Sequence, residues 1–213
     1  VRSVALLDSG YQRGQIPVDH SDAAVMLYLQ GRDDSLLERA HMLLIGEMLS
    51  APFYTSLRTE KQLGYVVAAL ASNHLRVPGL ALLAQSPTAS EAQLNSEFLQ
   101  FLADYSEQVS ALTEEDLQRY KTSVLSNLQE TPKNLAELNG RFIESLDLGY
   151  SEFNFRDQLQ ARIEQVTLES FTSAYTAVAV KEVRALSVET ADPGRENTAV
   201  DLRRQGRVYP YKF

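Results

Sequence analysis

Two short apolar segments separated by a turn constrain the fold more than any other feature of this sequence. The segments cover residues 65–72 and 80–86, and the turn between them contains Pro78. A turn this short is compatible only with antiparallel strands, because a parallel pair needs a crossover of a dozen or more residues. The sequence therefore predicts that these two segments form a hairpin.

Three further segments have the length and apolar content of strands. They are residues 4–7, 23–30 and 183–189. The polar, glycine-containing stretch that runs through Gly10 and Gly14 to Pro17 is expected to be a loop. Asp192-Pro193-Gly194 is expected to close the final strand with a turn.

Apolar residues recur at helical intervals over most of the remaining chain. Ser35, Ser90 and Thr113 each stand three residues before a Glu, Gln or Asp, which is the spacing of a helix cap. Thr131 before Pro132 is another expected helix entrance, and Pro52 is expected to open a short second helix. The predicted helices cover residues 36–49, 90–109, 113–129, 132–147, 155–164 and 168–179.

These elements indicate an α+β fold, with a mainly antiparallel sheet and helices packed on one face. The chain has 213 residues and 44% apolar content, enough for one core. Residues 1–200 are expected to form a single domain, and residues 201–213 a basic tail carrying Arg203, Arg204, Arg207 and Lys212.

Composition excludes several function classes. The chain has no cysteine, so no disulfide or thiolate site exists. The net charge of −8 argues against a nucleic-acid partner. No apolar run approaches the roughly 18 residues of a membrane span, so a soluble protein is expected, with periplasm and cytoplasm both open as its location.

A catalytic centre is not expected in this chain. The three histidines, His20, His41 and His74, are widely separated, and neither H-E-x-x-H nor H-x-x-E-H occurs. Glu38 precedes His41 by one helical turn, but two ligands fall short of the three that a catalytic zinc needs. No residue of this chain is therefore expected to be catalytic or to bind a metal.

The distinctive segment is PFYTSLRTEKQLGYVV, residues 52–67. Arg58 projects near the end of the predicted helix and Tyr65 opens the following strand, so both can point at one surface. From physical reasoning alone, a purely structural role stays open for each residue. Arg58 could be an ion-paired surface residue, and Tyr65 could serve only in packing.

This segment resembles the pitrilysin and insulin-degrading enzyme family of inverted zincins, most closely their C-terminal half. The resemblance implies a metalloprocessing-peptidase-like domain in a two-half enzyme, whose N-terminal domain binds the catalytic zinc while the C-terminal half closes the chamber over the substrate. It implies that Arg58 and Tyr65 bind the substrate backbone and that Gln62 and Gly64 shape the turn between them.

The leading hypothesis is therefore the C-terminal substrate-binding and chamber-closing domain of a zinc metalloendopeptidase that degrades peptides. Its expected partners are peptide substrates and the N-terminal catalytic half of the same enzyme, which is expected upstream of Val1. The alternative is a non-proteolytic structural subunit of the processing-peptidase or respiratory-complex core type. A third reading, an independent binding module, stays open. An H-x-x-E-H motif upstream in the same chain would favour the peptidase.

Overall fold

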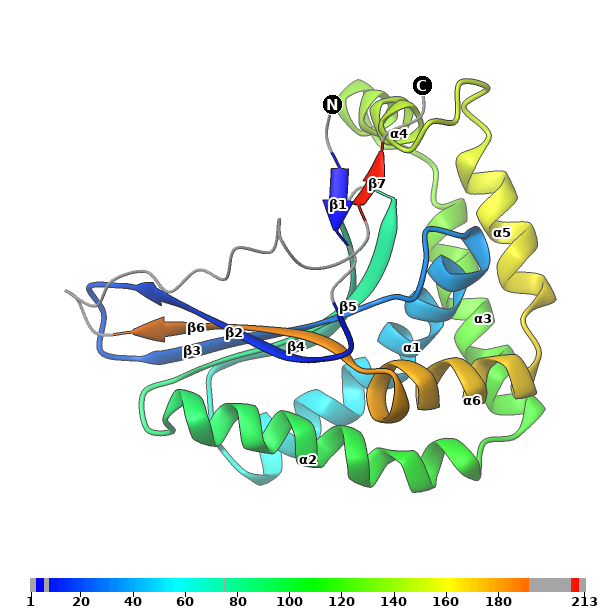
Figure 1. Cartoon of the computed structure of the whole chain (residues 1–213). Coiled ribbons are helices and arrows are strands. Elements are labelled where there is room, and N and C mark those ends of the chain that lie inside the picture. Colours follow the sequence, from blue (N-terminus) through cyan, green and yellow to red (C-terminus); the bar gives the residue numbers. More distant parts are fainter. Residues whose placement is uncertain (1–2, 6–7, 75, 192–207, 211–213) are drawn as a thin grey trace.

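The computed structural model describes residues 3–5, 8–74, 76–191 and 208–210, and a five-stranded sheet forms its centre (Figure 1). The strands are β2 (Gly10–Pro17), β3 (Ala23–Gln30), β4 (Val66–His74), β5 (Val77–Ser86) and β6 (Arg184–Ala191). Their order across the sheet is β2-β6-β3-β5-β4. Neighbouring strands are antiparallel except β2 and β6, which are parallel. The predicted α+β class with a mainly antiparallel sheet is confirmed.

The predicted hairpin is the β4–β5 pair. Val66 lies opposite Gln85 and Ala69 opposite Leu82, in an antiparallel register that continues to the pair His74 and Val77. The turn is therefore shorter than predicted, because both strands extend into the segment that contains Pro78. β3 pairs with the other side of β5, which places the two most apolar strands in the middle of the sheet.

The loop predicted through Gly10 and Gly14 is wrong, since this stretch forms strand β2. It lies at the edge of the sheet and pairs only with β6, so Tyr11 lies opposite Ala185. An edge strand tolerates polar residues and a terminal Pro17, because one side of its backbone needs no sheet partner. Its hydrogen-bonding partner β6 lies far along the chain, so the residues around β2 give almost no indication that this stretch is a strand.

The short strand predicted at residues 4–7 appears as β1 (Ser3–Ala5). It pairs with β7 (Val208–Pro210) in a separate two-stranded antiparallel sheet. The turn predicted at Asp192–Gly194 and the predicted basic tail, apart from β7, lie outside the described residues. The domain boundary at residue 200 stays a prediction.

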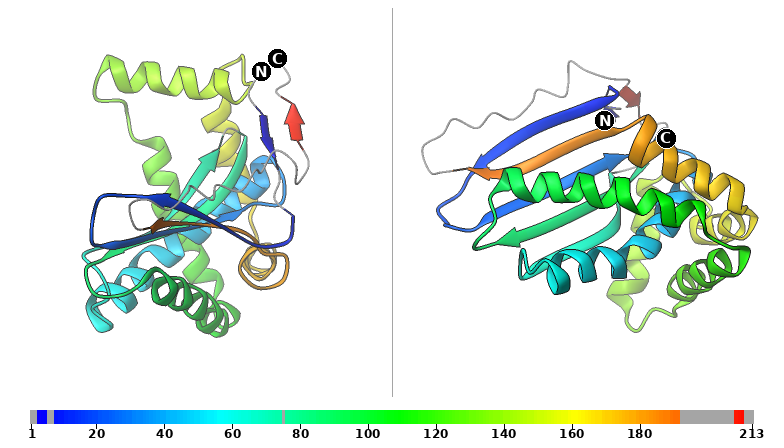
Figure 2. Two further views of the ribbon diagram at one scale, coloured as in Figure 1. Left: turned by 60° about the vertical axis from the view of Figure 1, so that its left-hand side comes forward. Right: turned by 90° about the horizontal axis from the view of Figure 1, so that it is seen from below.

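Six α-helices and two π-helical segments complete the described fold. They are α1 (Leu36–Tyr54), η1 (Thr55–Glu60), α2 (Glu91–Ser110), α3 (Glu114–Gln129), α4 (Leu135–Asp147), α5 (Phe155–Gln165), α6 (Leu168–Thr176) and η2 (Ala177–Lys181). Figure 2 shows α1 and α2 lying across one face of the sheet. α1 packs on β4 and β5, and α2 on β3 and β6, while α3, α5 and α6 contact the outer side of α1.

α1 is consequently buried on nearly all sides. Its buried residues include both apolar side chains, such as Leu44 and Met48, and the charged Glu38 and Arg39. A helix that is apolar around most of its circumference is typical of a position inside the core. Gly46 permits the close approach to β4, since a β-carbon there would lie 2.7 Å from the backbone nitrogen of Ala71.

The predicted caps at Ser35, Ser90 and Thr113 are confirmed, because each side chain accepts a hydrogen bond from the first helical turn. The start predicted for α4 at Pro132 is wrong. Asn134 caps this helix by accepting the backbone N–H of Glu137, so helical geometry begins only at Leu135.

Candidate substrate-binding site

α1 does not end before Pro52 as predicted, but continues through it to Tyr54. Proline lacks the N–H for the i−4 hydrogen bond and crowds the preceding turn, so the helical ladder is perturbed at this point. The next six residues form η1, and π-helical turns inserted into α-helices are frequent at functional sites. The second short helix predicted here is thus a π-helical continuation of α1.

η1 presents Arg58 to solvent. Leu57 is fully buried and anchors the segment, whereas Arg58, the next residue, is exposed. Within the described part of the chain, Arg58 forms no hydrogen bond or ion pair. The ion-paired reading of Arg58 therefore has no support in this structure, and its five N–H donors are available to a ligand.

The turn from η1 to β4 depends on two residues of the motif. Gln62 adopts φ = 52°, in the left-handed region that few non-glycine residues occupy. Gly64 lies against β5, where a β-carbon would come within 2.4 Å of the carbonyl oxygen of Gln85. The backbone N–H of Leu63 donates to the Leu57 carbonyl at 2.9 Å, which closes the turn back on η1.

Tyr65 follows this turn and directly precedes β4. Its backbone N–H donates to the carbonyl of Gln85 at 3.1 Å, and its side chain is 49% exposed. Its hydroxyl donates to Oδ2 of Asp22 at 2.7 Å. This hydrogen bond to Asp22 raises the pKa of the Tyr65 hydroxyl.

Asp22 is a partner of Tyr65 that the sequence did not reveal. It lies directly before β3, 43 residues from Tyr65, and also accepts a hydrogen bond from Nε2 of Gln85 at 3.3 Å. No spacing rule connects Asp22 to Tyr65, because only the sheet order β3-β5-β4 brings them together.

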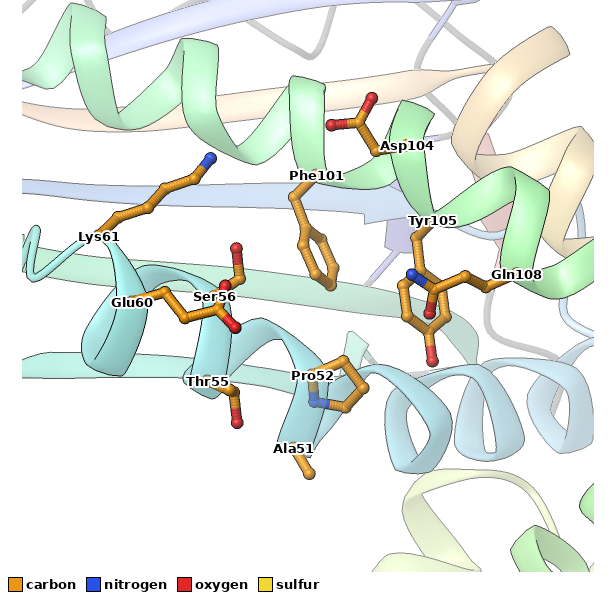
Figure 3. Close-up of a pocket in the computed structure, with 10 residues that line it drawn as sticks. All are labelled: Ala51, Pro52, Thr55, Ser56, Glu60, Lys61, Phe101, Asp104, Tyr105 and Gln108. Carbon is orange, nitrogen blue, oxygen red and sulfur yellow. The ribbon is translucent and has the colours of Figure 1, made fainter.

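A cleft of about 530 Å³ opens on another side of η1, between η1 and α2 (Figure 3). Polar and aromatic side chains both line it, and neither Arg58 nor Tyr65 belongs to it. The residues that line it are Ala51, Pro52, Thr55, Ser56, Glu60, Lys61, Phe101, Asp104, Tyr105 and Gln108. The structure thus separates this cleft from the two predicted binding residues.

The three histidines lie in different environments and do not form a zinc site. His20 lies beside Asp22, and the His74 ring packs edge-on against Tyr28. His41 is buried, with Nδ1 3.7 Å from the Glu38 carboxylate and Nε2 3.4 Å from Ser170 Oγ. Over the described ranges, no three His, Cys, Asp or Glu side chains converge as metal ligands.

Glu38 is paired with Arg32. Its carboxylate accepts from Nη2 of Arg32 at 2.6 Å and from the Arg32 backbone N–H at 2.9 Å. Burial raises the pKa of Glu38, but His41 and Arg32 lower it more, to about 2. The pair of Glu38 and His41 noted in the sequence therefore does not fit a zinc centre.

None of the helices in the described part of the chain combines the length and the apolar character that a membrane span needs.

Comparison with known proteins identifies the relatives of this fold and motif. Residues 44–143 match the family model described as "PQQ synthase PqqF-like, C-terminal lobe domain 4". Protease 3 of Salmonella typhi is 26% identical over 164 residues, which is 77% of this chain and 17% of that protein. Coenzyme PQQ synthesis protein F of Pseudomonas protegens is 29% identical over 159 residues, 75% of this chain and 19% of that protein.

Solved structures share the fold. Pitrilysin superimposes with a TM-score of 0.77 at 21% identity, over 94% of this chain and 22% of that one. A peptidase M16 inactive domain from Pseudomonas fluorescens superimposes with a TM-score of 0.62 at 15% identity, over 88% of this chain and 44% of that one. The chain thus spans about a fifth of the length of the curated relatives it matches. In sequence and fold, the chain is thus similar to a C-terminal domain of the pitrilysin and PqqF-like peptidases.

Proposed function

We propose that this chain is the substrate-binding and chamber-closing domain of a zinc metalloendopeptidase that degrades peptides. The catalytic zinc and the glutamate that activates water belong, in this proposal, to an N-terminal half of the same enzyme. Arg58 and Tyr65 bind the substrate backbone, while Gln62 and Gly64 shape the turn that holds them.

The observation that carries the proposal is the exposed guanidinium of Arg58 on the π-helical segment η1, which has no partner among the residues that the structure describes. A charged group without a protein partner is free to form charge-assisted hydrogen bonds with peptide carbonyls. Gln62 and Gly64 occupy backbone positions that few other residues tolerate, so they set the separation between Arg58 and Tyr65. The protease names of several relatives agree with a peptide as the ligand.

A second feature supports membership of a larger assembly. α4 presents a row of apolar side chains to solvent, at positions that share one face of the helix. They are Leu135, Leu138, Phe142, Ile143 and Leu146, with exposures from 37% to 79%, and Phe153 packs edge-on against Phe142. Contiguous exposed apolar side chains mark interaction surfaces in soluble proteins. We assign this surface to contact with the remainder of the peptidase.

The decisive experiment compares Arg58→Ala with Arg162→Ala in the full-length enzyme, using a quenched fluorescent peptide. Arg162 is also an exposed arginine, but it lies on α5 and donates to Gln165, so it controls for the loss of a surface charge. Arg58→Ala is expected to lower kcat/KM about ten- to a hundredfold, the value of one charge-assisted hydrogen bond. Equal turnover by the two variants would contradict the proposal.

A further inference from the structure

Three strand ends meet at one end of the sheet. Asp22 directly precedes β3, Tyr65 directly precedes β4, and Gln85 is the penultimate residue of β5, which lies between them. β3 and β4 are therefore two strand spacings apart, roughly 10 Å. The Tyr65 side chain bridges this gap across the end of β5 and reaches Oδ2 of Asp22 at 2.7 Å.

The two partners of this hydrogen bond differ in exposure. The Asp22 side chain is 13% exposed, whereas Tyr65 is 49% exposed. Asp22 is held on several sides, because Gln85 donates to its carboxylate and its own backbone N–H donates to Nδ1 of His20 at 3.0 Å. The carboxylate is thus a fixed point, and the tyrosine ring is the part of the pair that an incoming molecule meets.

This geometry determines what the Tyr65 hydroxyl can offer. A phenol has a single O–H proton and two lone pairs. The proton is committed to Asp22, and the hydrogen bond to Asp22 raises the pKa of Tyr65, so the proton stays on the phenol. Only the lone pairs remain for a ligand, which makes Tyr65 an acceptor. Arg58 has donors and no acceptor, so the two residues are chemically complementary.

We propose that Asp22 is a positioning residue that holds Tyr65 as a hydrogen-bond acceptor for one backbone N–H of the bound peptide. The proposal rests on the proposed function, since it specifies how the same site recognises its substrate. An extended peptide carries both backbone carbonyls and N–H groups, so Arg58 binds a carbonyl while Tyr65 binds an N–H. The site would then select for an extended peptide backbone rather than for a side chain.

The test combines protein variants with backbone-modified substrates in the full-length enzyme. Each substrate is a quenched fluorescent peptide in which one backbone N–H is replaced by an ester oxygen, scanned along the sequence. The protein variants are Tyr65→Phe, Asp22→Ala, Asp22→Asn and the double variant Asp22→Ala/Tyr65→Phe. Tyr54→Phe is the matched control, because Tyr54 is 47% exposed and lies in the same region.

Tyr65→Phe and Asp22→Ala are each expected to lower kcat/KM about three- to tenfold on the unmodified peptide, mainly through KM. The double variant is expected to be no worse than either single one, because both remove one interaction. Asp22→Asn retains an acceptor oxygen and is expected to stay within about twofold of the wild type. At one position of the peptide, the ester substitution is expected to lower the kcat/KM of the wild type by the same factor. The same substitution is expected to cause no further loss of kcat/KM in Tyr65→Phe.

Three results would overturn the inference. One is an additive loss in the double variant, and another is an ester scan in which no position removes the Tyr65→Phe penalty. The third is a rise in kcat/KM for Asp22→Ala, which would mean that Asp22 withholds the proton from a peptide carbonyl. In each of these cases Arg58→Ala still lowers turnover if the proposed function holds. Loss of both the Arg58 and the Tyr65 effects would instead overturn the proposed function as well.

Discussion

The carbonyl oxygen of Gln85 lies 2.4 Å from the position that a β-carbon would occupy at Gly64. The contact is to backbone near the end of β5, where the strand is paired on both sides and cannot move aside without disturbing its register with β4 and β3. The turn that separates Arg58 from Tyr65 therefore requires glycine at this position.

Gly64→Ala is expected to destabilise the chain by about 1–3 kcal/mol, because the added methyl overpacks a rigid contact. Urea unfolding measures the change. Gly140→Ala is the control, since no atom lies within 4 Å of a β-carbon there and alanine favours the helix. That variant is expected to gain up to about 1 kcal/mol, so equal stabilities for the two variants would contradict the assignment.

The pairing of Glu38 with Arg32 predicts a dependence of stability on pH. Burial opposes ionisation of Glu38, but His41 and Arg32 lower its pKa from 4.5 to about 2. A carboxylate with a lowered folded-state pKa stabilises the fold above its unfolded-state pKa, and this stabilisation is lost as pH falls through the folded-state value. The full contribution, at most about 3 kcal/mol, is therefore present above about pH 5 and declines toward pH 2.

Glu38→Gln should accordingly be less stable than the wild type at pH 7, and the difference should shrink as the pH is lowered from 5 to 2. Glu130→Gln is a suitable control, because Glu130 pairs with Lys133 at the surface and solvent screens that ion pair. A stability difference between Glu38→Gln and the wild type that stays constant over this range would contradict the prediction.

The buried hydroxyl of Tyr175 donates to the Leu102 carbonyl at 2.7 Å and links α6 to α2. Burial raises the pKa of Tyr175, so the hydroxyl stays protonated and donates at any ordinary pH. Tyr175→Phe is expected to cost about 1 kcal/mol, the net value of one intramolecular hydrogen bond. Tyr54→Phe, at an exposed position, should change the unfolding free energy little. Equal unfolding free energies would show that the bond contributes nothing.

The exposed apolar face of α4 predicts separate effects on folding and on assembly. Leu135 is 79% exposed and Leu146 is 51% exposed, so replacing both by glutamate should leave the melting temperature of this chain nearly unchanged. The same change should weaken its binding to the remainder of the peptidase, measured by calorimetry with the separately produced part. Val180→Glu, at 49% exposure on η2, is the control. If the double glutamate variant binds as tightly as the wild type, α4 does not belong to the interface.

The isolated chain is expected to bind no stoichiometric zinc and to cleave no peptide. Metal analysis after dialysis and a chelator-sensitive peptidase assay measure these properties. His41→Ala is the informative variant, because His41 and Glu38 are the nearest approach to a ligand pair. One tightly held zinc per chain that is lost in this variant would contradict the prediction.

The sequence by itself determined the elements whose signals are local. Residues 23–30 form the predicted strand, the β4–β5 hairpin forms as predicted, and Ser35, Ser90 and Thr113 cap their helices. Each of these depends on a run of apolar residues, a short turn or a side chain three residues from its partner. The motif around Arg58 and Tyr65 also revealed the resemblance to the pitrilysin-type peptidases, because its residues are contiguous.

Only the tertiary structure decided the features that depend on distant segments. β2 is a strand because β6 supplies its hydrogen bonds, and Pro52 lies within a helix because tertiary packing around α1 overrides its local effect. Asp22 meets Tyr65 because β5 lies between their strands. A sequence pattern indicates the local conformation that residues close together in the chain favour. These contacts arise from the sheet order, which is set by burial of the whole core.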